Sequence, residues 1–171
     1  MSALSVGVPT EIKPDERRVA VTPDGVTELV SHDVEVLVQA GAGAGIGIAD
    51  DAYRVAGAEV VDTAEEVWAR AGLVCKVKEP QASELVLLRE DMTLFTYLHL
   101  AAYPAVAEAL CAAGTTGIAY ETVMRADGAL PAGQGQQRGD GDAGRDRRAF
   151  EVGHLVGAGR QRLCGDVEAR Q

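Results

Sequence analysis

The 171-residue sequence has few of the features that mark secreted, metal-binding or membrane proteins. Its three cysteines, Cys75, Cys111 and Cys164, are odd in number and far apart, so they predict neither a disulfide framework nor a CxxC-type metal site. No apolar run approaches the ~18 residues needed to span a bilayer. The N-terminus lacks the basic start and apolar core of a signal peptide. We therefore expect a cytoplasmic protein without a metal site.

The sequence has fewer basic residues than acidic ones, 16 against 26. The formal net charge is −10, and the only lysines are Lys13, Lys76 and Lys78. The overall field of so acidic a chain repels the phosphates of nucleic acids and anionic membranes. We therefore expect a small-molecule partner, no nucleic acid and no membrane.

Over residues 1–131, short β-branched runs alternate with segments of helical spacing. Val34–Val38 and Leu73–Val77 are typical of the runs, which predict strands. Strands that alternate with helices indicate βαβ units. We therefore expect an α/β domain with a Rossmann-like, three-layer arrangement and a mainly parallel sheet of about six strands.

The segments between the strands carry helix signals. Thr22 before Pro23 predicts an N-cap followed by proline in the first helical turn. Thr63–Glu66 has the spacing of a capping box, in which the hydroxyl and the carboxylate each satisfy a free backbone N–H. Residues 85–88 and 105–110 also fit helices, so that we expect about five in all.

The sequence changes character after Pro131. Residues 132–152 contain no leucine or isoleucine and show no apolar periodicity, so they cannot bury enough surface to offset the entropy of ordering. We expect a domain over 1–131 and a tail of low order over 132–171. The tail is either a flexible Gly/Arg/Asp-rich segment or the product of a shifted reading frame, since these residues crowd together without structural pattern.

Polar groups follow three of the predicted strands. Arg17 and Arg18 lie in the loop after the first strand, where an arginine can clamp a carboxylate through two parallel N–H groups. The alternative is a solvated surface pair. Open α/β sheets bind ligands beyond the carboxyl ends of their strands, which makes this loop a candidate for substrate binding.

Lys76 and Lys78 end the predicted strand that begins at Leu73, and alternation puts both on one face. Lysines are unusual in a buried parallel strand, so an ammonium here could polarise a carbonyl or pair with a carboxylate. The alternative is an edge strand with solvated lysines.

His99 directly follows the next apolar strand. The pKa that is usual for a histidine side chain suits acid–base chemistry. The alternative is a core residue, since a histidine in an apolar setting is often one.

A glycine-rich stretch, Gln39–Gly47, follows another strand and suggests a dinucleotide-binding turn. Its spacing fails, because the sixth position counted from Gly41 or Gly43 is isoleucine, and Asp50 and Asp51 precede the next helix. We interpret it as a structural loop and assign no cofactor-binding residue.

With these motifs in place, the sequence resembles alanine dehydrogenase from about Leu4 to Pro131. The matching motifs, in order and at family-like spacing, are Val6–Glu11, Glu16–Pro23, Gln39–Gly43, Lys76–Pro80, Leu98–Ala101 and Ala119–Val123. A related transhydrogenase subunit shares the opening motif. Its members tend not to carry Lys76–Pro80 or Leu98–Ala101, so the resemblance to alanine dehydrogenase is favoured.

The resemblance implies a role for each candidate. Arg18 corresponds to the arginine that holds the substrate carboxylate, Lys78 to the lysine that polarises its carbonyl, and His99 to the acid–base residue. The family reversibly oxidises L-alanine to pyruvate and ammonia with NAD, which supplies the hydride chemistry. Its members form homo-oligomers, commonly hexamers.

The tail departs from the family pattern. No usable GxGxxG follows Pro131, so we expect a truncated or frame-shifted chain that lacks the NAD domain and is inactive alone. The alternative is a module that binds pyruvate or alanine, or caps a partner, without catalysis.

Overall fold

A computed structural model of the chain describes residues 4–123. The strands in this range are β1 (Ser5–Val8), β2 (Glu35–Gln39), β3 (Glu59–Val61), β4 (Leu73–Cys75), β5 (Thr93–Thr96) and β6 (Thr116–Ala119). The α-helices are α1 (Pro23–Ser31), α2 (Asp50–Val55), α3 (Ala64–Arg70) and α4 (Pro104–Ala113). Short 3-10 turns are η1 (Ala44–Ile46), η2 (Leu85–Leu87) and η3 (Tyr120–Thr122).

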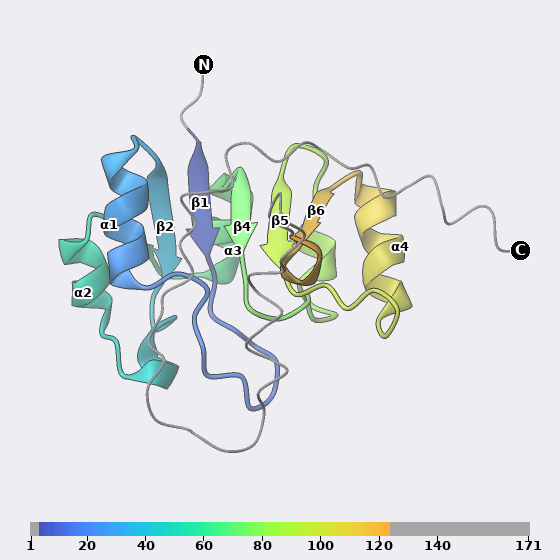
Figure 1. Cartoon of the computed structure of the whole chain (residues 1–171), viewed down its shortest axis with the longest axis horizontal. Helices are drawn as coiled ribbons and strands as arrows, with labels where there is room; N and C mark the ends of the chain where they lie inside the picture. Colours follow the sequence, from blue (N-terminus) through green and yellow to red (C-terminus); the bar gives the residue numbers. More distant parts are fainter. Residues whose placement is uncertain (1–3, 124–171) are drawn as a thin grey trace, which may run out of the picture.

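The strands form one sheet in the order β3-β2-β1-β4-β5-β6, and every neighbouring pair is parallel. All the arrows accordingly point the same way in Figure 1. The predicted α/β fold with about six strands is confirmed. The chain winds outward from β1 to β3, returns to β4 on the other side of β1, and continues to β6. The winding therefore reverses between β1 and β4.

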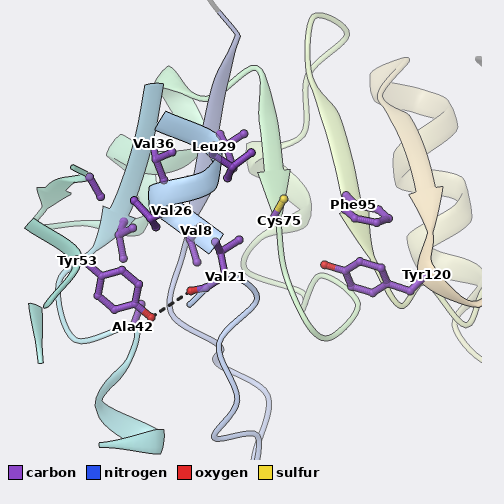
Figure 2. Packing of buried hydrophobic residues seen from close by; sticks show 13 residues of the cluster. Val8, Val21, Val26, Leu29, Val36, Ala42, Tyr53, Cys75, Phe95 and Tyr120 are labelled. Carbon is purple, nitrogen blue, oxygen red and sulfur yellow. Dashed lines mark hydrogen bonds between the residues drawn. The ribbon is translucent and has the colours of Figure 1, made fainter. Parts of the chain in front are cut away.

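Helices cover both faces of the sheet, as the strand alternation dictates. Val6 and Val8 of β1 pack with α1 and α2 on one face, and Val74 of β4 packs with α3 and α4 on the other. Figure 2 shows the first of these layers, where the buried Tyr53 hydroxyl donates a hydrogen bond of 3.1 Å to the Val21 carbonyl. The predicted three layers are present.

Gly7 explains how closely α3 approaches β1. A Cβ atom at Gly7 would lie 2.6 Å from Cβ of Ala71 and 2.7 Å from Cγ1 of Val67. Only a residue without a side chain lets the helix lie this near the strand.

The helices α1 and α3 begin where predicted, but their N-caps make fewer hydrogen bonds than predicted. The Thr63 hydroxyl accepts the Glu66 N–H at 3.2 Å, whereas the Glu66 carboxylate pairs with Arg70. Thr22 is the N-cap of α1, but its buried hydroxyl has no hydrogen-bond partner within residues 4–123. Residues 85–87 form one 3-10 turn and Leu88 is extended and buried, so the predicted helix over 85–88 is wrong.

No helix among residues 4–123 is long and apolar enough to cross a bilayer. The domain boundary at 131, the tail over 132–171 and its frame-shift interpretation lie outside the described residues.

Candidate functional site

The candidate residues lie where the winding reverses. The loop 9–22 leaves the carboxyl end of β1, and residues 76–79 leave the carboxyl end of the adjacent β4. In open parallel sheets, this switch point forms the crevice that binds ligands. Residues 97–99 follow β5 and Glu121 follows β6. Four strands that are neighbours in the sheet therefore place polar groups at the edge formed by their carboxyl ends.

Arg18 forms a bidentate ion pair with Glu16. The Arg18 Nε lies 2.8 Å from Glu16 Oε1, and the Nη2 lies 2.5 Å from Oε2. The same carboxylate accepts the Arg18 backbone N–H at 2.9 Å. The hydrogen bonds from Arg18, opposed by burial, lower the pKa of Glu16 below its usual range. This charged pair fixes the guanidinium while about half of the arginine side chain stays exposed.

Lys76 and Lys78 have different surroundings. Lys76 is fully buried, with its Nζ 2.8 Å from Glu84 Oε1 and 3.4 Å from Glu11 Oε2. Lys78 is only half-buried, and its backbone carbonyl accepts the Thr96 hydroxyl at 2.8 Å. The edge-strand alternative is wrong, because β4 lies between β1 and β5. Lys76 is a structural cation, which leaves Lys78 as the lysine that a ligand could reach.

Glu11 joins the loop after β1 to the segment after β4. Its carboxylate accepts the backbone N–H groups of Val77 at 2.6 Å and Lys78 at 3.3 Å. Burial raises the pKa of Glu11, and Lys76 opposes that rise. Glu11 therefore places the backbone of Lys78 beside the loop that carries Arg18.

His99 has an unusual backbone, with φ of +46°. Its N–H donates to Glu121 Oε1 at 2.8 Å, and its ring stacks on the Tyr97 ring with a centroid distance of 5.7 Å and an interplanar angle of 8°. His99 is thus held through its backbone by Glu121 and through its ring by Tyr97.

The charges of Arg18 and Lys78 act on groups that neighbour the predicted residues. Burial raises the pKa of the Tyr97 hydroxyl and the Arg18 charge opposes this rise, and the Tyr97 ring stacks on His99. Lys78 is among the smaller influences that lower the pKa of Glu16, the partner of Arg18. Two cations and an imidazole on one sheet edge can hold a carboxylate, polarise a carbonyl and transfer a proton.

Sequence reasoning missed the groups that orient these three. Glu11 and Glu16 lie within the loop that yielded Arg18, and Tyr97 lies two residues before His99. Glu121 follows β6 just as His99 follows β5. The rule that selected His99, a polar residue at a strand's carboxyl end, would also have selected Glu121.

A further ion pair lies beside the site. The buried Glu79 carboxylate accepts a hydrogen bond from Lys13, whose Nζ also lies 3.2 Å from the Tyr103 hydroxyl. Burial alone would raise the pKa of Glu79, but the contacts led by Lys13 together lower it. The ion pair links the loop after β1 to the segment after β4, and the Tyr103 contact links the same loop to the start of α4.

The glycine-rich loop does not fit a dinucleotide. The Gly41 N–H is already bound to Asp50 Oδ1 at 2.8 Å, and a Cβ at Gly45 would lie 2.5 Å from the Arg17 carbonyl oxygen. The helix that follows, α2, has only six residues and carries Asp50 and Asp51 in its first turn, which would repel a phosphate. The loop packs against the segment that carries Arg17. Residues 4–123 also contain no cluster of three metal-ligating side chains.

Comparisons with known proteins identify the family of this chain. The family described as "Alanine dehydrogenase/PNT, N-terminal domain" matches residues 7–134. An alanine dehydrogenase of Mycolicibacterium smegmatis is 57% identical over 126 residues, which are 74% of this chain and 34% of that protein. An alanine dehydrogenase of Bacillus subtilis is 53% identical over 118 residues, 69% of this chain and 31% of that one.

Solved structures show the same relationship. An L-alanine dehydrogenase superposes with a TM-score of 0.72 at 46% identity, covering 75% of this chain and 35% of its own. A transhydrogenase from Sinorhizobium meliloti reaches 0.67 at 31% identity, with 72% and 35% covered. The chain thus spans about one third of the length of the relatives it matches. By its parallel sheet, its motifs and the match over residues 7–134, the chain belongs to the alanine dehydrogenase/PNT family, whose N-terminal domain it contains.

Proposed function

We propose that this chain carries the substrate-binding side of an alanine dehydrogenase, which interconverts L-alanine with pyruvate and ammonia. The observation that supports the proposal is the placement of Arg18, Lys78 and His99 on segments that leave the carboxyl ends of the neighbouring parallel strands β1, β4 and β5. The names of the relatives support the choice of reaction. Cytoplasmic location and homo-oligomeric assembly are part of the same proposal.

Arg18 is proposed to bind the substrate carboxylate. Its Nε and Nη2 each donate to Glu16. A guanidinium has five N–H donors, so the Nη1 side and one further Nη2 hydrogen are left for a second carboxylate. Because Glu16 already fixes the plane of the guanidinium, little freedom is lost when the substrate binds.

Lys78 and His99 are proposed to act on the carbon that changes oxidation state. The Lys78 ammonium would polarise the pyruvate carbonyl, which makes its carbon a better acceptor for ammonia. The His99 imidazole would exchange protons with the oxygen as water is added or lost. NAD is the hydride carrier that the resemblance implies. Because the described residues do not fit its pyrophosphate, they are assigned substrate binding and proton transfer only.

Calorimetric titration of pyruvate into the 171-residue chain tests the proposal. Substitution of Arg18 by alanine removes charge-assisted hydrogen bonds to the carboxylate, so affinity should fall by about 10- to 100-fold. Arg17→Ala is the matched control, because Arg17 is an exposed neighbour of the same charge. We expect wild-type affinity in this control. Equal affinity in wild type and Arg18→Ala would refute the assignment of Arg18.

Pyruvate-dependent NADH oxidation tests the catalytic half of the proposal. We expect pyruvate binding without turnover by the chain alone, since residues 4–123 offer no fitting site for the pyrophosphate. Turnover comparable to that of a full-length relative would contradict this expectation. Binding without turnover also fits a module that captures pyruvate, and the same Arg18 contact underlies both functions.

A further inference from the structure

The backbone of His99 is strained in a way that needs an explanation. Within residues 4–123, only Asp15, Asp33 and His99 adopt positive φ without being glycine. Such a conformation is uncommon outside glycine and persists where the surroundings enforce it. His99 is the third residue beyond β5, and a relaxed extended backbone there would carry its ring to a different place.

Glu121 supplies contacts that hold this backbone conformation. Its Oε1 accepts the His99 N–H at 2.8 Å and the Leu98 N–H at 3.1 Å, and its Oε2 lies 3.3 Å from the same Leu98 nitrogen. On the other side, the His99 carbonyl accepts the N–H groups of Ala102 at 2.8 Å and Tyr103 at 3.2 Å. The peptide between Leu98 and His99 is therefore clamped by a charged acceptor.

The fold places Glu121 where it can do this. β6 pairs with β5 in a register that sets Ala119 beside Thr96, so the residue two positions beyond β6 reaches the turn just beyond β5. Within the described range, the Glu121 carboxylate contacts backbone N–H groups and no cation. Its negative charge thus strengthens the hydrogen bonds to the turn.

We propose that Glu121 is a positioning residue, which holds His99 in its left-handed conformation and so keeps the imidazole stacked on Tyr97. The proposal rests on the function proposed above, because the position of the ring matters only if His99 acts on the substrate. Glu121 acts through His99 and touches no reacting atom. A carboxylate that only joins β5 to β6 would have the same hydrogen bonds, so the experiment must separate the two roles.

Nuclear magnetic resonance on the 171-residue chain separates the positioning role of Glu121 from a purely structural one. The variants are Glu121→Ala, Glu121→Gln and the control Glu108→Ala, which removes an exposed carboxylate from α4. The Gln side chain keeps one carbonyl acceptor but loses the charge. The readouts are amide hydrogen exchange and the chemical shifts of the His99 ring protons, which the stacked Tyr97 ring displaces.

In Glu121→Ala, the Leu98 and His99 amides should exchange about 10- to 100-fold faster, the effect of losing charge-assisted hydrogen bonds. The His99 ring shifts should move toward those of the exposed His32. In Glu121→Gln, the ring shifts should be mostly restored and exchange should rise roughly three- to tenfold, because neutral hydrogen bonds are weaker. Thr96 and Ala119 amides should be unchanged in both variants, and Glu108→Ala should match wild type.

Unchanged ring shifts in Glu121→Ala would overturn the proposal, as would an equal loss of protection at Thr96 and Ala119, which indicates a structural role. If the alanine variant fails to fold, Glu121→Gln decides, since unaltered exchange at Leu98 and His99 would refute the clamp. None of these readouts needs substrate. Failure of pyruvate to bind would therefore remove the proposed function while leaving the clamp measurable.

Discussion

Substitution of Lys76 by methionine should strongly destabilise the domain. The Lys76 side chain is fully buried, and the side chains of Glu84 and Glu11 are only 5% and 3% exposed. Methionine has nearly the same length but no charge, so both carboxylates would remain buried without their cation. Removing one partner of a buried ion pair destabilises a protein by about 3–5 kcal/mol. A domain of this size has a total stability of only about 5–15 kcal/mol.

The loss of stability in the Lys76→Met variant should depend on pH in a defined direction. Burial already raises the pKa of Glu11 above 4.5, and Lys76 opposes the rise. Without Lys76 the pKa of Glu11 should climb further, so the native state binds a proton more readily than the unfolded state does. The stability of the variant then falls as the pH rises from the unfolded value through the native one. The deficit should therefore be larger near about pH 8 than near about pH 5.

Urea denaturation at both pH values measures the effect. Lys78→Met is the matched control, because it removes the same charge two positions along from a half-buried side chain, and should change stability by less than about 1 kcal/mol. Adding Glu84→Gln to Lys76→Met should recover part of the loss, with a coupling of about 0.5–3 kcal/mol. A Lys76→Met deficit below about 1 kcal/mol, or one equal at both pH values, would refute this reasoning.

Three further predictions concern other parts of the domain. Gly7→Ala should cost about 1–3 kcal/mol in thermal or urea unfolding, because its Cβ would lie 2.6 Å from Ala71; a neutral effect would show that α3 moves freely. Thr63→Ala should lose about 1 kcal/mol through the missing cap on α3, and Thr63→Ser should restore it. The lowered pKa of Glu16 contributes stability above 4.5 that is lost as the pH falls through its native value, so Glu16→Gln should flatten the acid limb of the unfolding profile. An unchanged acid limb would contradict that assignment.

Local patterns in the sequence were sufficient to predict the sheet and the edge of it on which three candidate residues lie. Strand alternation predicts the two faces of β1, and the rule of strand carboxyl ends predicts that Arg18, Lys78 and His99 share an edge. These inferences succeed because each depends on periodicity and chain direction. The resemblance supplied the separate roles of the three residues, which geometry alone does not assign.

What sequence reasoning missed depends on contacts between distant segments. Lys76 and Lys78 look equivalent along the chain, and only the fold reveals that Glu11 and Glu84 enclose one of them. The Glu66 carboxylate completes no capping box, because Arg70 lies one turn further along α3 and binds it instead. The clamp on His99 requires the register of β6 on β5, which no local pattern encodes.

The central claim is that one sheet edge brings three segments together around a 2-oxo acid. Titration of pyruvate into the 15N-labelled chain, followed by amide chemical shifts, tests this claim most directly. We predict that saturable shift changes gather at residues 16–18, 76–79 and 97–99, and that sodium chloride at the same ionic strength does not reproduce them. Changes confined to the glycine-rich loop at 41–47, or no saturable change at any of the three segments, would contradict it.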